Sequence, residues 1–359
     1  MTMIIKRDYY LQQLISSKSN NLIKIVTGIR RSGKSFLLFN LFHNHLIETG
    51  ISEDHIIEIA LDDRLNKNLR DPDVILQHIH ERIVDDKLYY IILDEVQMID
   101  EFTDVLNSLL HIRNADVYVT GSNSKFLSKD VVTEFRGRGD EIHLFPLSFA
   151  ELYNSIGGDK FELWKSYYTY GGLPGILELD SEKKKAAYLR SLHETVYLKD
   201  IIERNNLKNS EEFMELMRVM ASCIGSPCNP SKLENTFKSV KNETLDRKTI
   251  SKYLSYMEDA FLIEKSMRYD IKGRKYIGTL SKYYFQDIGL RNALLNFRQV
   301  EENHIMENVI YNELRLRGFC VDVGMVEART AKERKQLEVD FVANMADRRY
   351  YIQSAFAMP

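Results

Sequence analysis

The chain has 359 residues, of which 44% are hydrophobic and 28% are charged, and its formal net charge is −3. This composition excludes a disordered, collagen-like or disulfide-scaffold protein, and the length gives room for two or three domains. It also excludes a globally basic nucleic-acid-binding protein, although not a local basic segment. The three cysteines form no metal-ligand or disulfide pattern, and we recognise neither a membrane-spanning run nor a signal peptide. We therefore expect a cytoplasmic protein with no membrane contact.

The first 150 residues alternate β-type runs with amphipathic helices, which is typical of a parallel α/β sheet. The predicted strands are Leu22–Thr27, His55–Leu61, Tyr89–Leu93, Asp116–Thr120 and Glu141–Leu144, with helices near 34–48, 72–86 and 101–113. The run 89–93 is continuously apolar, which suits a strand covered on both faces.

From about residue 150 the pattern becomes mainly helical. The turn cluster 171–175 separates two helices, and further helices are predicted over 182–205, 211–223, 230–240 and 246–260. A β-hairpin follows, with strands Ile263–Tyr269 and Lys282–Phe285. Three helices followed by a hairpin is the layout of a winged helix. We then predict a helix over Glu302–Leu316 and β-runs at 319–326, 337–343 and 349–355.

The strongest motif is a G-x4-G-K-S string over residues 28–35, between a predicted strand and a predicted helix. Glycines let successive backbone N–H groups turn towards phosphate oxygens. Lys34 is expected to reach the β- and γ-phosphates, and the Ser35 hydroxyl to ligate Mg²⁺. The residues expected to bind the nucleotide here are Gly28, Arg30, Arg31, Ser32, Gly33, Lys34, Ser35 and Phe36.

A second motif agrees with the first. The apolar strand 90–93 ends in Asp94 and Glu95, an arrangement in which the aspartate serves Mg²⁺ and the glutamate orients or deprotonates the attacking water. The next strand ends near Ser122, which either contacts the γ-phosphate or attacking water or caps a helix.

Two arginines, Arg136 and Arg138, follow on a Gly-flanked loop. An arginine in such a loop acts either as a finger against the transferred phosphate or as a solvated charge. The residues themselves leave both alternatives open.

These strings together resemble the prokaryotic AAA-family ATPases that carry a C-terminal domain of unknown function. The matching strings are Thr27–Ser35, Leu93–Gln97, Thr120–Ser122, Phe145–Phe149, Tyr170–Pro174, Tyr197–Ile201 with Arg204, and Lys282–Gly289. The resemblance covers nearly the whole chain and implies an AAA-type P-loop core that uses ATP and Mg²⁺, a winged helix, and a fold like the PD-(D/E)XK nucleases. It also implies that Arg7 and Tyr10 help to form the nucleotide-base pocket and that Arg138 is the arginine finger.

Residues 231–285 carry 12 Lys/Arg and 7 Asp/Glu, a local excess of positive charge in a chain of net charge −3. Three of these cations lie near the start of the helix 246–260 and three in the hairpin turn 272–275. A basic helix in the major groove with a basic wing on phosphate would have this pattern. The alternatives are a solvated helix face and a protein-packing module, so DNA and a protein are both candidate partners.

The C-terminal part has Glu307 on a helix, Asp340 in a β-run and Gln353 in the next, a spacing that resembles the nuclease pattern. Ala355 stands where that pattern has a lysine, and without the cation the attacking water loses its usual support. The chain also ends at Pro359 directly after the last β-run, where such a fold would continue into a helix. We expect a degenerate or truncated nuclease-like fold.

The sequence therefore predicts an AAA-type P-loop core over 1–150, a helical lid or linker over 151–208, a winged helix over 209–290 and a nuclease-like domain over 291–359. The predicted activity is Mg²⁺-dependent ATP binding and hydrolysis that drives a conformational switch in DNA-associated regulation. One alternative is an ATP-bound regulator or scaffold without turnover that binds DNA or protein. A less favoured alternative is an ATP-dependent nuclease.

Overall fold

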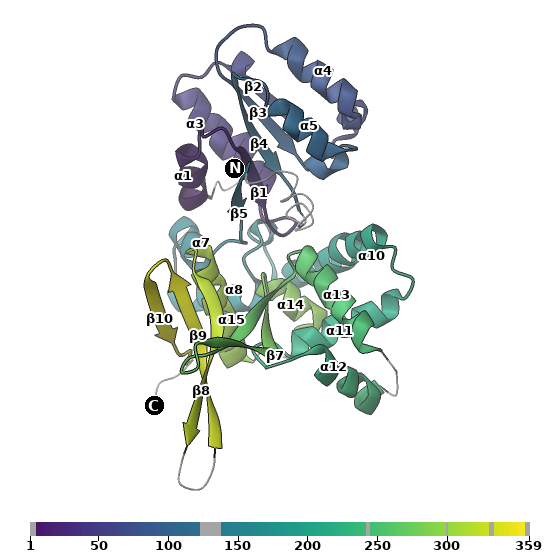
Figure 1. Cartoon of the computed structure of the whole chain (residues 1–359), viewed down its shortest axis with the longest axis vertical. Helices are drawn as coiled ribbons and strands as arrows, with labels where there is room; N and C mark the ends of the chain where they lie inside the picture. Colours follow the sequence, from purple (N-terminus) through teal and green to yellow (C-terminus); the bar gives the residue numbers. More distant parts are fainter. Residues whose placement is uncertain (1–4, 123–137, 242–244, 299–300, 330–333, 356–359) are drawn as a thin grey trace. The chain divides into compact units, whose positions relative to one another are not determined.

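The computed structural model of the chain describes residues 5–122, 138–241, 245–298, 301–329 and 334–355. The chain divides into two compact units, Met1–Leu144 and Phe145–Pro359. Each unit has its own sheet and its own helices (Figure 1). The finer division of the second unit into a lid, a winged helix and a nuclease-like domain stays a prediction.

Unit 1 is built on a five-stranded parallel sheet with the strand order β2-β3-β4-β1-β5. The strands are β1 Ile23–Thr27, β2 Ile56–Ala60, β3 Tyr89–Asp94, β4 Ala115–Thr120 and β5 Gly139–His143. Every residue of β1 and of β3 is buried, as the continuous apolar run of β3 requires. The predicted α/β class with a parallel-sheet core is confirmed, and each predicted strand is present to within two residues at either end.

The helices of unit 1 are α1 Asp8–Ser16, α2 Lys34–Phe36, α3 His43–Glu48, α4 Pro72–Arg82 and α5 Phe102–Leu109. A π-helical stretch, Leu37–Phe42, joins α2 to α3, so the helical chain runs unbroken over 34–48 as predicted. Helix α4 starts after Asp71, whose carboxylate accepts two backbone N–H groups. It ends four residues before the predicted 86, because the Asp85 carboxylate accepts the N–H of Lys87 in a turn.

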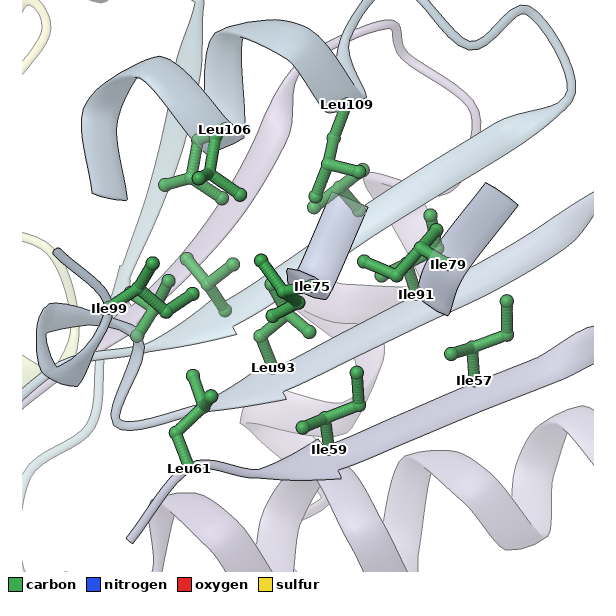
Figure 2. Close-up of a cluster of buried hydrophobic side chains, with 14 of the residues drawn as sticks. Ile57, Ile59, Leu61, Ile75, Ile79, Ile91, Leu93, Ile99, Leu106 and Leu109 are labelled. Carbon is green, nitrogen blue, oxygen red and sulfur yellow. The ribbon is translucent and has the colours of Figure 1, made fainter. Parts of the chain in front are cut away.

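Both faces of this sheet are covered. Figure 2 shows Ile75 and Ile79 of α4, and Leu106 and Leu109 of α5, in one cluster with strand residues that include Ile91 and Leu93. On the other side the Phe42 ring packs 4.5 Å from the Tyr118 ring of β4 and 6.3 Å from the Tyr90 ring of β3. Each fully buried apolar side chain of this kind contributes roughly 1.5–3 kcal/mol. The sheet is therefore packed between two layers of buried side chains.

The helices of unit 2 are α7 Phe149–Ile156, α8 Lys160–Tyr170, α9 Glu182–Leu192, α10 Lys199–Asn205, α11 Ser210–Ser222, α12 Pro230–Thr236, α13 Arg247–Asp259, α14 Ile288–Leu294 and α15 Glu302–Leu316. A π-helical stretch, His193–Leu198, joins α9 to α10, so the predicted helix over 182–205 is continuous. A second π-helical stretch, Phe237–Lys241, extends α12. The sequence did not predict α1 of unit 1 or α14.

The sheet of unit 2 is mixed, with the order β10-β9-β8-β6-β7. Its strands are β6 Ile263–Asp270, β7 Lys275–Phe285, β8 Cys320–Arg329, β9 Arg334–Met345 and β10 Arg348–Ile352. The predicted hairpin is present as β6 and β7, but β6 also pairs in parallel with β8. One sheet therefore joins the part predicted as a winged helix to the part predicted as nuclease-like.

Candidate functional site

The phosphate loop follows β1 directly and ends where α2 begins at Lys34. Gly28 and Gly33 have φ angles of 137° and 97°, and Arg31 also has a positive φ of 65°. A Cβ on Gly28 would lie 2.2 Å from the carbonyl oxygen of Leu144, so only glycine fits there. Alternation of this kind turns successive backbone N–H groups to one side, which is the geometry that binds an anion.

Lys34 is buried, and its ammonium group lies on the loop itself. The Nζ atom donates to the carbonyl oxygens of Gly28, at 3.0 Å, and Ile29, at 3.2 Å. Burial lowers the pKa of Lys34, while the nearby carboxylates of Glu95 and Asp94 act in the opposite direction. The predicted phosphate-binding cation and the two predicted acids therefore lie within electrostatic reach of one another.

Asp94 ends β3 and has a partner for each carboxylate oxygen. The Ser35 hydroxyl donates to Oδ2 at 2.7 Å, and the Thr120 hydroxyl donates to Oδ1. Burial raises the pKa of Asp94, and the hydroxyls of Thr120 and Ser35 act against that rise. The structure thus brings together Ser35 and Asp94, the pair predicted to serve Mg²⁺.

Two side-chain oxygens are a donor set that fits Mg²⁺, which is commonly held by one or two protein oxygens together with waters and substrate phosphates. Within the described ranges, no group of three or more His, Cys, Asp or Glu side chains could form a metal cage. A Mg²⁺ ion at Ser35 and Asp94 would therefore need the phosphates of a bound nucleotide.

Glu95 is fixed through both its backbone and its side chain. It has a left-handed conformation, with φ 53° and ψ 48°, which is costly for a residue other than glycine. Its N–H donates to the Thr120 hydroxyl oxygen at 2.8 Å. Its carboxylate accepts hydrogen bonds from Ser122 Oγ, at 3.1 Å, and from the Gln97 amide. Arg30 Nε also lies within 3.4 Å of Ser122 Oγ, so Ser122 joins the acid to the loop.

Ser122 contacts Glu95, and its predicted role towards the γ-phosphate or attacking water stays a prediction. The alternative, a helix cap, depends on residues 123 onwards, which lie outside the described residues. Arg136 lies outside them as well.

Arg7 and Tyr10, the predicted base-pocket residues, lie beside the phosphate loop. Arg7 is buried, its Nη1 donates to the carbonyl oxygen of Ser32 at 3.3 Å, and its guanidinium lies 4.6 Å from the centroid of the Tyr10 ring. Arg31 and Phe36 are exposed.

Arg138 is not brought to this site within its own chain. Its side chain is exposed, and its carbonyl oxygen accepts the N–H of Ile23, the first residue of β1. The phosphate loop leaves the other end of that strand.

Two residues that contact the acids were not predicted as part of the site, Thr120 and Gln97. A signal for Thr120 was present in the sequence. Thr120 ends the strand that neighbours the Asp94 strand, and neighbouring strands of a parallel sheet end at the same edge, so its hydroxyl must lie near Asp94. No comparable signal exists for Gln97.

The predicted nuclease-like residues form a second buried polar cluster in unit 2. Glu307 Oε1 accepts hydrogen bonds from Lys282 Nζ at 2.8 Å and from the Tyr284 hydroxyl at 2.7 Å, and Lys282 Nζ also lies 2.8 Å from Glu338 Oε1. Asp340, by contrast, accepts from the Gln353 side-chain amide at 2.7 Å.

Lys282 is only 2% exposed, so a buried ammonium group forms ion pairs with both Glu307 and Glu338. Burial raises the pKa of Glu307, and the charge of Lys282 acts against that rise. Among the described residues this cluster does not fit a divalent metal, because the Lys282 ammonium group already lies between the carboxylates that would have to bind the ion.

Comparison with known proteins agrees with this geometry. Residues 20–153 match the model described as "AAA domain", and residues 161–301 match the model described as "Domain of unknown function (DUF8612)". An uncharacterized protein of Haemophilus influenzae is 34% identical over 363 residues, which cover 99% of this chain and 88% of that protein. The chain belongs to the family of this protein. An uncharacterized protein of Methanocaldococcus jannaschii is 30% identical over 357 residues, 94% of this chain and 75% of that one.

The N-terminal part of this family member therefore carries an AAA domain. Among solved structures, the chain is similar to Aeropyrum pernix Orc1 in complex with DNA, with 12% identity, a TM-score of 0.33, and coverage of 82% and 93% of the two chains. It is also similar to the Saccharomyces cerevisiae Hsp104:casein complex, with 12% identity, a TM-score of 0.37, and coverage of 77% and 58%. Both scores are too low to transfer a function. No helix in the described ranges has the length and apolar character that crossing a membrane requires.

Proposed function

We propose that this AAA-domain protein binds ATP with Mg²⁺ at the phosphate loop and hydrolyses it. The observation that carries the proposal is the convergence of Lys34, Ser35, Asp94 and Glu95 at the carboxyl ends of β1 and β3, which lie on either side of β4. Ligands of open parallel sheets bind at this edge.

Each residue has a distinct role in the proposed reaction. Lys34 exchanges its two loop carbonyls for oxygens of the β- and γ-phosphates, and Mg²⁺ supplies charge neutralisation on those phosphates when it is bound. Glu95, held by Ser122 and Gln97, orients a water molecule and accepts its proton as the water oxygen attacks the γ-phosphorus. The bond from the γ-phosphorus to ADP breaks in the same displacement.

One chain segment connects the phosphate loop to unit 2 directly. The N–H of Leu144 donates to the carbonyl oxygen of Thr27 at 2.8 Å, and the Leu144 carbonyl lies against Gly28 of the phosphate loop. The next residue, Phe145, is the first of unit 2. We propose that movement of the phosphate loop on nucleotide binding is passed to unit 2 through this chain segment.

Arg138 is exposed and is not brought to the site of its own chain. We propose that it acts as the arginine finger on a nucleotide bound by a second copy.

The test is ATP binding and phosphate release by three variants of the full chain. Lys34→Ala should lose both activities, whereas Glu95→Gln should still bind ATP but release little phosphate. Lys87→Ala, which removes an exposed lysine of unit 1, is the matched control and should behave as the wild type does.

Phosphate release that is unchanged in Lys34→Ala would refute the proposed site. If the wild type binds ATP tightly but turns none over, with or without duplex DNA, the alternative of an ATP-bound regulator is correct instead.

Duplex DNA is a second proposed ligand, supported by the exposed face of α13. This helix buries Ile250, Leu254 and Met257 and leaves Arg247, Lys248 and Lys252 exposed. A helix with this charge distribution can lie in the major groove. Binding that weakens steeply with salt, and weakens further when the three cations are replaced by alanine, would support DNA. Absence of any duplex binding would favour a protein partner for this face.

A further inference from the structure

Part of one face of the mixed sheet of unit 2 is exposed. Ile352 of β10 packs with Tyr284, Phe341 and other residues of the core cluster on the side of α15. Because successive strand residues point to opposite faces, Tyr351 and Arg349 of the same strand project from the other side. Tyr351 is 53% exposed.

Tyrosines continue along this second face on β6 and β7. Tyr269 and Tyr276 are directly paired across these two strands, and their ring centroids lie 5.5 Å apart in an edge-to-face arrangement. Tyr276 is 58% exposed. Burial of such rings is the usual outcome of folding, so two large, exposed tyrosines on one sheet face need a reason.

Arg349 of β10 also contacts Tyr269 of β6. Its guanidinium lies 5.4 Å from the centroid of the Tyr269 ring, and its Nε donates to Asn344 Oδ1 at 2.7 Å. Hydrogen bonding to Tyr351 raises the pKa of Arg349, and Tyr269 acts in the same direction. A cation is thus held among the rings in a fixed orientation.

Positive charge also surrounds the β6–β7 turn. Lys272, Arg274 and Lys275 are all exposed there. The acids beside them make internal hydrogen bonds, since Asp270 accepts the N–H of Gly273 at 2.9 Å and Asp322 of β8 accepts the Tyr276 hydroxyl at 3.2 Å. The face therefore offers cations next to exposed rings.

We propose that this tyrosine face, formed by Tyr269, Tyr276, Arg349 and Tyr351 with the turn 272–275, binds single-stranded nucleic acid. Unpaired bases stack on the exposed rings of Tyr276 and Tyr351, and the three turn cations contact the phosphates between them. The paired bases of a duplex are already stacked on one another and offer no free ring surface to these tyrosines. The ligand chemistry, a planar base joined to a phosphate, is shared by RNA and DNA.

This site is independent of the ATPase site and of the exposed face of α13, and the experiment keeps the three apart. Fluorescence anisotropy is measured on the full chain with labelled oligo(dT), oligo(U) and a mixed-sequence duplex, each about 12 nucleotides long to match a typical single-strand site. Each titration is carried out at two salt concentrations.

We expect the single strands to bind more tightly than the duplex. The double variant Tyr276→Ala with Tyr351→Ala should weaken single-strand binding by about tenfold or more, and the matched double phenylalanine variant should bind nearly as the wild type does, because stacking needs the ring and not the hydroxyl. Replacing the three turn cations with alanine should lower the salt slope by about 2. Both tyrosines are largely exposed, and unchanged ATP turnover and thermal unfolding would show that the variants are folded.

Three results would overturn the proposal: no binding of either single strand by the wild type, duplex binding at least as tight, or an alanine pair that binds as the wild type does. Binding of only oligo(U) or only oligo(dT) would support it and identify the ligand as RNA or DNA. Loss of single-strand binding when the cations of α13 are replaced, with the tyrosine variants unaffected, would assign the binding to α13 instead.

Discussion

Replacing Thr120 with valine tests how the two acids of the candidate site are held in place. The Thr120 side chain is fully buried at the end of β4, and its hydroxyl donates to the Asp94 carboxylate and accepts the Glu95 N–H at 2.8 Å. Valine has nearly the same shape and removes both hydrogen bonds at once. Serine removes only the methyl group, so Thr120→Ser is the matched control.

The size of the effect follows from these two bonds. A hydrogen bond to a charged group contributes about 1.5–3 kcal/mol and a neutral one about 0.5–1.5 kcal/mol, so the valine variant should lose about 2–4 kcal/mol. If half of this loss is felt in the transition state, kcat for ATP falls by about 5- to 30-fold. The other half should appear as reduced stability of the adjoining strand ends.

Two measurements separate these parts. Phosphate release under saturating ATP gives kcat, and hydrogen exchange of the peptides that contain β3 and β4 reports local opening of the sheet. We expect Thr120→Val to lose turnover and protection together and Thr120→Ser to stay close to the wild type. Wild-type turnover and protection in Thr120→Val, or a serine variant as damaged as the valine variant, would refute the reasoning.

Two further predictions concern the phosphate loop and unit 2. Gly28→Ala should lose at least about 2 kcal/mol of stability and weaken ATP binding by about tenfold, because its Cβ would lie 2.2 Å from the Leu144 carbonyl oxygen. The control Gly50→Ala has a positive φ but lies in open space, so it should lose only about 1 kcal/mol. Thermal unfolding and ATP titration measure the two effects, and equal losses in both variants would contradict the steric argument. Burial lowers the pKa of His193 to about 4, so the unfolded chain takes up this proton first. The contribution of a neutral His193 to the stability of unit 2 is therefore fully present above about pH 6.5 and is lost, by about 3 kcal/mol, as the pH drops towards 4. His193→Leu should remove this acid-induced loss of stability. Urea unfolding at each pH, followed by the fluorescence of Trp164, the single tryptophan, measures it. A variant that is still as acid-sensitive as the wild type would contradict the assignment to His193.

The core of unit 1 could be predicted because its signals are local. An apolar run such as 89–93 suits a strand covered on both faces, as in a parallel α/β sheet, and the loop that ends at Lys34 follows a strand and opens a helix. Once both strands are placed in one parallel sheet, their carboxyl ends meet, so the contact of Ser35 with Asp94 follows from the prediction.

What could not be predicted depends on contacts between segments far apart in the chain. Helix α14 has seven residues and contains Gly289, a weak helix former. That glycine is explained only by the fold, since a Cβ there would lie 2.0 Å from the carbonyl oxygen of Tyr170. The role of Lys282 was missed for the same reason, because Glu307 of α15 and Glu338 of β9 reach this β7 residue only in the folded sheet.

The positive charge of residues 231–285 shows how far a count of charges can mislead. Lys282 and Arg268 are buried, the first between two glutamates and the second against the sulfur of Met325, so neither side chain is available to contact a phosphate. Besides the exposed lysines Lys232, Lys238 and Lys265, the segment has two exposed groups of three cations, one on α13 and one in the turn 272–275. The first lies on a helix, the shape that fits a duplex groove, and the second lies beside the exposed Tyr276, the partner that an unpaired base requires. A single basic segment in the sequence therefore becomes two surfaces in the fold, and the two sets of variants distinguish a duplex-binding protein from a single-strand-binding one.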